Sequence, residues 1–486
     1  MAPRDKSVIH FTLSEEEVLV EGKLPARCRP HRRHPRYRWC EARPFPRQLC
    51  LWIACLALPG LSAPLAAHPV LTFVVTSHIE VSKGPPQAPT DETFPLIVTL
   101  GHRFLTVEAK DVRTIYDFDR NRIFELDLRK KTYQDVSLYS NIGFRVLEFY
   151  NRTHLGNAIR AAQIETPIMQ PALVEHLFSL TDDDSQTVID NTSQNGETAF
   201  LWRQHILMTV SSKTEKLPAA HQAEYWRFMR YYAGGHPEIY ASLSLVKGVP
   251  KKITVVRTDQ NTETRIMTLT GIATPADAGY ALDGFMLSMP DREPYTTLKL
   301  VAADAAAQVK TRAAEALSDR DSAMSQGRYL DALLANYEVY FSTGGQDLAW
   351  MRSSGDRLKT DSGVLELAGA LSRHDAAQLP AAADELSSLR TAASARREII
   401  DVFEGNVRLE MGQAGQGESL LLGAARKNPY LTSVWHDLAD YYYRSFRMPE
   451  AWSCMDAARR VAPDHPILKP LNDLERTLRG KNPEFF

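Results

Sequence analysis

The chain has 486 residues, of which 44% are hydrophobic and 24% charged, an ordinary composition that excludes collagen-like, disordered and polytopic membrane proteins. At about 150 residues per domain, this length predicts two or three domains. The net charge of -2 hides an asymmetry, because residues 1–48 hold 11 basic and 6 acidic side chains and residues 68–486 hold 46 and 53. We expect no nucleic-acid partner, since a mildly acidic chain lacks the basic stripe that phosphate binding needs.

The segment 1–67 has the pattern of an export signal preceded by an unusual leader. An uncharged apolar run extends from Leu49 to Leu58, with arginines before it, a Pro-Gly pair after it and small residues up to Ala67. This order predicts a signal peptide over 49–67 and an exported chain that begins at or near His68. We therefore expect a periplasmic or secreted protein. A membrane anchor is the lesser alternative, because a spanning helix needs about 20 apolar residues.

Residues 1–48 are rich in Arg and Pro and show no periodicity. Such a composition cannot bury enough apolar surface to fold, so we expect either a disordered leader or upstream sequence translated in frame. Four of the five cysteines lie at or before the apolar run, and Cys454 alone lies beyond it. One thiol cannot form an intrachain disulfide, so packing must hold the remaining chain together.

Alternating apolar and polar residues begin at Val70. Each segment is rich in β-branched and aromatic residues, and Gly, Pro, Asp or Asn clusters separate the segments, which predicts an antiparallel meander. The predicted strands cover residues 70–81, 93–100, 103–110, 112–119, 122–128 and 132–138.

Helical periodicity then interrupts the strand pattern, and strands return around Asn195-Gly196, a strong two-residue hairpin signal. This change from strand-like to helix-like segments and back predicts an α+β domain over residues 70–295, which is antiparallel, β-rich and has helical insertions. The predicted helices cover 137–162, 171–180 and 218–235, and the later strands lie within 186–212, 251–258 and 264–272.

Two local strings suggest chemistry and are better explained by structure. Asp117, Asp119 and Asn121 have calcium-loop spacing, but Arg122 and Leu128 replace the required Gly and Glu, so we predict a hairpin turn. Within 231–240, paired glycines before His-Pro predict a helix end, a turn and a new helix at the proline.

The histidine of that string, His236, has a catalytic or metal-binding alternative. No HExxH pair and no neighbouring histidine supplies a partner, and the chain lacks phosphate-binding, nucleotide-binding and nucleophile-elbow motifs. We therefore predict no catalytic residue, no cofactor and no metal ligand, and expect that the protein is not an enzyme. A hydrolase without a recognisable motif stays a third hypothesis for the function.

The meander with its Tyr-Asp-x-Asp turn, over 94–138, resembles the lipoprotein-carrier domains of bacterial envelopes. In that family a curved antiparallel sheet encloses an apolar cavity for acyl chains. The resemblance implies that the aromatic side chains of this segment face inward toward a lipid; the alternative is that they pack as ordinary core or cross-strand pairs. The aromatic residues concerned are Phe104, Tyr116, Phe118 and Phe124.

Beyond Leu298 the sequence becomes Ala-rich with helical periodicity. Two stretches, 403–430 and 435–465, overlay at one constant shift, which indicates stacked helix pairs. Weaker units lie at 325–344 and 365–389, and 467–480 has the pattern of a capping helix. Matching small or terminating positions are Gly405 and Ala439, Gly417 and Ala451, Ala424 and Ala458, and Pro429 and Pro463.

The stretch 435–465 resembles the tetratricopeptide repeat, and together with the stretch before it the resemblance covers residues 398–466. The resemblance rests on Trp435, Leu438, Ala439, Tyr442, Ala451, Ala458 and Pro463. It implies a helical-repeat array over 299–486 with a concave groove, formed by the first helix of each pair, that binds a protein or peptide. Its partner-binding positions would be Asn406, Glu410, His436, Asp440, Tyr443 and Arg444.

These features predict an exported bacterial envelope protein that acts as a protein–protein interaction scaffold through its repeats. The alternative is a carrier that holds a lipid or lipopeptide in the β-rich domain. Polar residues on a helix face are also commonly just solvated, so the groove positions are hypotheses.

Overall fold

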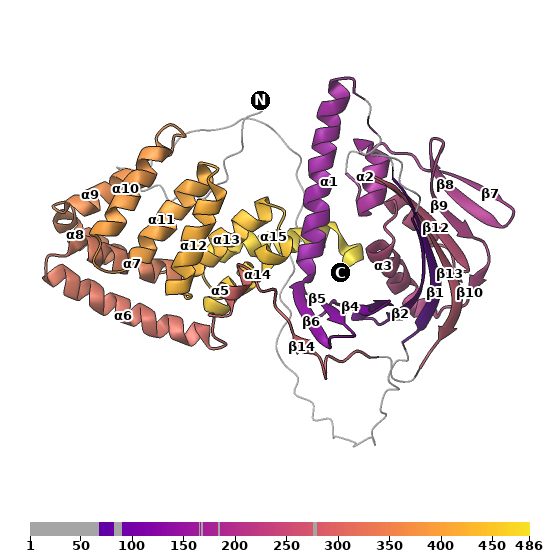
Figure 1. The fold of residues 1–486 in the computed structure, drawn as a ribbon, viewed down its shortest axis with the longest axis horizontal. Helices are drawn as coiled ribbons and strands as arrows, with labels where there is room; N and C mark the ends of the chain where they lie inside the picture. The colour runs from indigo at the N-terminus through magenta and orange to yellow at the C-terminus, as the bar shows by residue number, and fades with distance from the viewer. Residues whose placement is uncertain (1–67, 82–89, 165, 167–168, 183–184, 276–278) are drawn as a thin grey trace, which may run out of the picture. The chain divides into compact units, whose positions relative to one another are not determined.

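The computed structural model describes residues 68–81, 90–164, 166, 169–182, 185–275 and 279–486. The predicted leader and signal peptide therefore lie outside the described residues. A β-sheet domain with helical insertions is followed by an array of helices (Figure 1), which confirms the predicted α+β fold class.

The first six strands form the predicted antiparallel meander, each paired with the next along the chain. Alternation places Leu71, Phe73 and Val75 of the first strand in the core. Between the fourth and fifth strands, the Asp117 carboxylate accepts a hydrogen bond from the Arg120 backbone N–H at 2.8 Å. This turn confirms the predicted hairpin. The strands are β1 (Val70–Glu80), β2 (Thr90–Leu100), β3 (Phe104–Ala109), β4 (Val112–Asp117), β5 (Arg122–Asp127) and β6 (Thr132–Ser137).

Later strands extend the same sheet on the other side of β1, and β14 extends it beyond β6, in the order β14-β6-β5-β4-β3-β2-β1-β13-β12-β9-β8-β7. β1 pairs antiparallel with β13, and β14 pairs parallel with β6. Asn195 and Gly196 have φ angles of 54° and 78°, the left-handed conformation of the predicted hairpin turn. These strands are β7 (Asp190–Gln194), β8 (Glu197–Trp202), β9 (His205–Ser211), β12 (Lys252–Thr258), β13 (Thr262–Ala273) and β14 (Met286–Leu287), with β10 (Thr214–Glu215) and β11 (Val249–Pro250) forming a separate pair.

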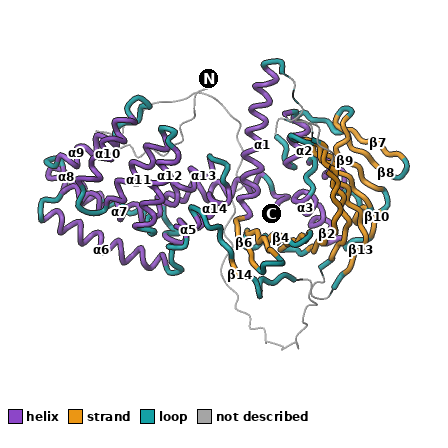
Figure 2. Tube along the Cα trace, viewed as in Figure 1, coloured by secondary structure: helices purple, strands orange, loops and turns teal. Residues whose placement is uncertain are grey.

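Helices cover the inner side of the curved sheet (Figure 2). α2 packs on β12 and α3 on β2. The aromatic residues of α3 fill the space beneath the strands, as shown by the stacked rings of Phe228 and Phe73, whose centroids lie 6.1 Å apart. The helices of this domain are α1 (Leu138–Ala161), α2 (Pro171–Phe178), η2 (Ala219–His221), α3 (Gln222–Tyr232) and α4 (Pro237–Leu243).

Two of the four aromatic side chains expected to face inward do so. The Tyr116 ring lies 4.4 Å from that of Tyr231 on α3, and Phe118 lies 6.3 Å from the same ring. The expectation is wrong for Phe104 and Phe124. Their cross-strand partners place them on the opposite face of the sheet, and both contact Tyr280 there.

The C-terminal part is an array of helices whose neighbours along the chain pack as pairs. The first residue of α14 follows the first residue of α12 by the constant shift that relates the two sequence stretches, and the last residues of the two helices are separated by the same shift. The array comprises α5 (Tyr295–Leu298), α6 (Ala305–Ser325), α7 (Tyr329–Thr343), α8 (Leu348–Leu358), α9 (Ser362–Leu371), α10 (Leu379–Ala392), α11 (Arg397–Glu410), α12 (Ala414–Lys427), α13 (Thr432–Arg444), α14 (Met448–Val461), η3 (Pro466–Leu468), α15 (Lys469–Lys481) and η4 (Pro483–Phe485).

The sheet domain and the helical array belong to one compact unit and share a hydrophobic core. α14 packs against α1 and β6, and α15 packs against α1. Across this contact Arg122 pairs with Asp456 at 2.5 Å, and the Tyr231 hydroxyl donates to the Phe485 carbonyl at 2.7 Å. The predicted domain boundary between 295 and 299 falls at the short helix α5. None of the helices described is long and apolar enough to cross a membrane.

Candidate functional site: a hollow at the end of the helical array

Helix α13 supplies two faces with different tasks. Trp435, Leu438 and Tyr442, at three- and four-residue spacing, are fully buried and pack the helix into the array. His436 and Asp440 lie on another face and remain partly exposed. The helix therefore holds its polar side chains in place through a rigid apolar stripe.

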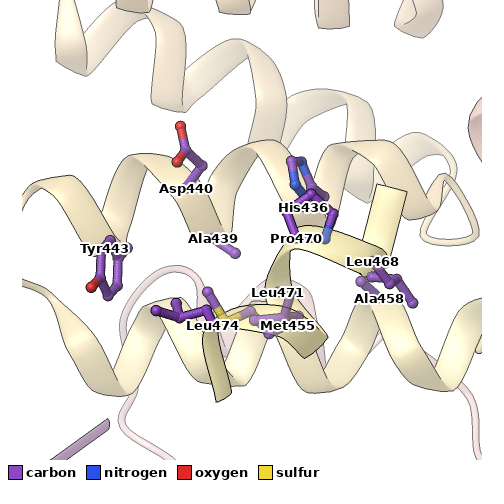
Figure 3. Close-up of a pocket in the computed structure, with 10 residues that line it drawn as sticks. All are labelled: His436, Ala439, Asp440, Tyr443, Met455, Ala458, Leu468, Pro470, Leu471 and Leu474. Atoms are coloured by element: carbon purple, nitrogen blue, oxygen red, sulfur yellow. The ribbon is translucent and has the colours of Figure 1, made fainter. Parts of the chain in front are cut away.

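This second face borders a cavity of about 160 Å³ between α13, α14 and the segment that begins at η3 (Figure 3). Its walls are mostly apolar, and the polar side chains come from α13 alone. The lining residues are His436, Ala439, Asp440 and Tyr443 of α13, Met455 and Ala458 of α14, and Leu468, Pro470, Leu471 and Leu474 of the terminal segment. We refer to this cavity as the terminal hollow.

The structure brings together three of the six residues predicted to bind a partner. His436, Asp440 and Tyr443 all line the terminal hollow. Arg444 is connected to it through Asp440, whose carboxylate lies 2.9 Å from the Arg444 guanidinium.

The other two predicted residues lie on α11, away from the hollow. The Asn406 amide donates to Asp437 at 2.7 Å, and the other carboxylate oxygen of Asp437 lies 3.2 Å from Nδ1 of His436. Asn406 therefore acts on the hollow only through this chain of contacts. Glu410 is exposed at the C-terminal end of α11.

The apolar half of the hollow is not among the residues predicted from the sequence. The tetratricopeptide resemblance implies a groove formed by the first helix of each pair, whereas Met455 comes from a second helix and Leu471 and Leu474 from the capping helix. The signal was present in the three-residue spacing of these leucines in the predicted cap. Burial raises the pKa of Tyr443, so its hydroxyl is a neutral hydrogen-bonding group at the edge of this apolar wall.

A second cavity, of about 360 Å³, lies where β5, β6, the segment before α5 and α14 meet. Three of its charged side chains contact one another, since Arg122 lies 2.6 Å from Asp135 and 2.5 Å from Asp456. The pair of Arg122 with Asp456 connects the sheet domain with the array. We therefore interpret this cavity as part of the junction between the two.

His236 is enclosed in the sheet domain, with 1% of its surface exposed. It precedes α4, which starts at the predicted proline, and its Nδ1 accepts from the Glu238 backbone N–H at 3.2 Å. The expectation that it lacks a partner is wrong: Glu175 of α2 lies 2.9 Å from its Nε2, and the His236 backbone N–H donates to Nδ1 of His176 at 3.0 Å. It lines neither of the two cavities described here, and its side-chain contacts connect α2 with the start of α4.

A group of metal-ligating side chains also forms in the structure, although no local motif predicts it. His102, His221 and Glu224 each place one ligand atom within 4.8 Å of the others. His221 and Glu224 have H-x-x-E spacing at the start of α3, a signal that sequence reasoning passed over, while His102 lies far earlier in the chain.

No known protein-family profile matches the chain, and no curated protein matches it either.

Proposed function

We propose that this protein is an exported envelope scaffold whose tetratricopeptide-like array holds an extended peptide of a partner protein. The terminal hollow is the proposed binding site, and one apolar side chain of the peptide is the proposed anchor. The single observation that carries the proposal is a small apolar hollow whose polar rim consists of His436, Asp440 and Tyr443, three positions at which tetratricopeptide-like repeats would contact a partner.

The size of the hollow favours a side chain over a small molecule or lipid. Pockets for drug-sized ligands measure roughly 300–1,000 Å³. A dry apolar cavity of about 150 Å³ is just large enough for benzene. With about 160 Å³, the terminal hollow matches one Leu or Phe side chain.

The rim of the hollow supports recognition of a peptide backbone. Asp440 is paired with Arg444 within one helix, and the Arg444 side chain is 61% exposed. Because exposed pairs of this kind contribute only about 0.3–0.5 kcal/mol, both side chains can turn toward a peptide at little cost. The Asp440 carboxylate would accept from a peptide N–H, and Arg444 would donate to a carbonyl.

Selection from a random-peptide display library on the purified protein tests this proposal. We expect selected peptides to share one large apolar residue and to lose roughly tenfold or more in affinity when Leu474→Trp fills the hollow. The matched control is Thr477→Trp, which introduces the same side chain at an exposed position of the same helix. Fluorescence anisotropy with a labelled peptide measures both affinities. Equal binding by the two tryptophan variants, or selected peptides without an apolar anchor, would overturn the assignment.

The lipid-carrier alternative has less support. The aromatic side chains of α3 occupy the inner side of the sheet, where a carrier would hold acyl chains. Both cavities described above lie outside that region. Native mass spectrometry of protein purified from the envelope tests the alternative directly, because a co-purifying lipid would restore it. The hydrolase hypothesis has less support as well, because His236, the residue on which it rests, is enclosed with 1% of its surface exposed.

A further inference from the structure

Three segments that are distant in the sequence place histidines at one corner of the sheet domain. His68 precedes β1, His102 lies in the turn between β2 and β3, and His221 ends η2. The rings of His102 and His221 stack with centroids 4.8 Å apart, and the His68 ring lies 6.3 Å from that of His221. Glu224, in the first turn of α3, contacts Nδ1 of His102 at 2.8 Å.

The backbone holds these segments firmly. β1 and β2 are paired up to Val70 and Thr99, and the Leu100 N–H donates to the Pro69 carbonyl at 2.9 Å. The Gly101 N–H closes the following turn on the Phe104 carbonyl at 3.0 Å. Because the sheet register determines where His68 and His102 emerge, their proximity does not depend on a free loop.

The cluster contains buried polar atoms that no protein group satisfies. Nδ1 of His68, Nδ1 of His221 and Oε2 of Glu224 are buried and have no hydrogen-bond partner. His221 itself is only 5% exposed. Buried polar groups are paired in the great majority of cases, so three unpaired atoms in one cluster require an explanation. All three can donate a lone pair to a cation.

We propose that His102, His221 and Glu224 bind a divalent first-row transition-metal ion such as Zn²⁺, with His68 as the fourth ligand. A zinc ion with bonds of about 2.1 Å holds its ligand atoms about 3.4 Å apart. The three ligand atoms already lie within 4.8 Å of one another, so side-chain rotations alone can close the shell.

The donor set selects the class of metal. Imidazole nitrogens with one carboxylate suit zinc, copper, nickel or iron, whereas calcium and magnesium require oxygen ligands. The His102 side chain is 50% exposed, which leaves a path for the ion to enter. An ion bound here joins the start of β1, the β2–β3 turn and α3, and would stabilise the corner that these segments form.

Zinc titration of the purified, chelator-treated full chain tests the site. The wild type should retain one more Zn²⁺ per chain than either of two variants, His221→Phe and His102→Ala. The phenylalanine of His221→Phe keeps an aromatic ring in the buried stack. The affinity of the site in His102→Ala should fall roughly tenfold or more. The matched control is His154→Ala, an exposed histidine on α1, which should retain the wild-type zinc content. Because the leader carries its own cysteines and histidines, the differences between variants are the measurement.

Co²⁺ substitution provides a second readout. The cobalt spectra of the wild type and His154→Ala should share a visible ligand-field component, and the spectra of His102→Ala and His221→Phe should lack it. The thiolate charge-transfer bands should be the same in all four proteins. If His221→Phe fails to fold, as judged by circular dichroism, His102→Ala decides the question, because that side chain is exposed. Equal zinc content and equal cobalt spectra in the wild type and His102→Ala would overturn the proposal.

Discussion

At the scale of single residues, Arg145 shows how one buried side chain connects three helices. It lies in α1, and its guanidinium donates to the carbonyls of Phe178 at 3.3 Å, Arg230 at 3.3 Å and Tyr231 at 3.1 Å. These carbonyls lie in the last turns of α2 and α3, where helices leave acceptors without partners. The arginine therefore satisfies groups that α2 and α3 cannot satisfy themselves.

Replacing this side chain, Arg145→Met, should lower the free energy of unfolding by about 3 kcal/mol, because the carbonyls stay buried without a donor. Urea denaturation followed by tryptophan fluorescence measures the change. Arg160→Met is the matched control, since Arg160 donates to one carbonyl from an exposed position of the same helix and should cost less than about 0.5 kcal/mol. Similar losses in both variants would contradict this role of Arg145.

His176 predicts a pH dependence. Burial, with His236 and Arg257 nearby, lowers the pKa of His176 to about 3, whereas the unfolded chain has a value of 6.5. The unfolded state therefore binds the proton first as the pH falls. This side chain contributes no pH dependence above about pH 6.5, and below it the free energy of unfolding falls by up to about 1.4 kcal/mol per pH unit until the pH approaches 3.

The variant His176→Asn keeps an acceptor for the His236 N–H and removes the titrating group. Plots of unfolding free energy against pH should be less steep for the variant than for the wild type between about pH 6 and 4, by close to one proton. Burial lowers the pKa of His221 and His465 as well, so some slope will remain. Parallel curves for the two proteins would show that His176 does not titrate in this way.

At the scale of elements, the contact between α11 and α12 depends on glycine. A Cβ built on Gly417 would lie 2.6 Å from the Leu409 side chain and 2.8 Å from the Gly405 carbonyl. The following pair, α13 and α14, has fully buried Ala439 and Ala451 at the equivalent positions. Small residues at the predicted positions therefore permit the close helix contact.

Gly417→Ala should destabilise the protein by about 1–3 kcal/mol, because backbone cannot move aside as a side-chain tip can. Gly423→Ala is the matched control in the same helix, where an added Cβ meets nothing within 4 Å. That substitution should stabilise the helix by up to about 1 kcal/mol through propensity alone. Opposite shifts of the thermal midpoint, followed by circular dichroism, are expected; shifts of the same sign would contradict the close contact.

At the scale of the whole molecule, the junction between sheet domain and array rests on another glycine. A Cβ on Gly143 of α1 would lie 2.5 Å from the ring of Trp452 on α14. Trp452 is fully buried and donates from its indole to Glu475 of α15 at 2.9 Å. The ring is thus held from two sides and cannot retreat.

Gly143→Leu should therefore separate the two parts while each keeps its own secondary structure. Limited proteolysis should then cut within the connection at 288–304 faster than in the wild type, and the radius of gyration should rise in small-angle scattering. Gly480→Leu, at an exposed position with no atom within 4 Å of an added Cβ, is the control and should keep the wild-type cleavage pattern. An unchanged pattern in Gly143→Leu would show that the junction tolerates the added side chain.

Features that depend on neighbours along the chain can be predicted from the amino-acid sequence. Alternation predicted β1 to β6, left-handed turn residues predicted the hairpin at Asn195-Gly196, and the constant shift between repeats predicted the equivalence of α12 and α14. Each of these signals arises from strand or helix geometry within a few residues. In a stacked repeat, the same local signal recurs in each unit. Three predicted groove residues met at one hollow because they share a single helix face.

Contacts between segments that are distant in the sequence become visible in the folded chain. Local periodicity does not predict three of these contacts. They are the pairing of β1 with β13, the contacts of His236 with Glu175 and His176, and the approach of His102 to His221 and Glu224. Local periodicity also does not predict that the capping helix forms an apolar wall of the terminal hollow. Long-range packing of a shared core selects these contacts, because many sets of amphipathic elements can bury the same apolar surface and side-chain fit chooses among them.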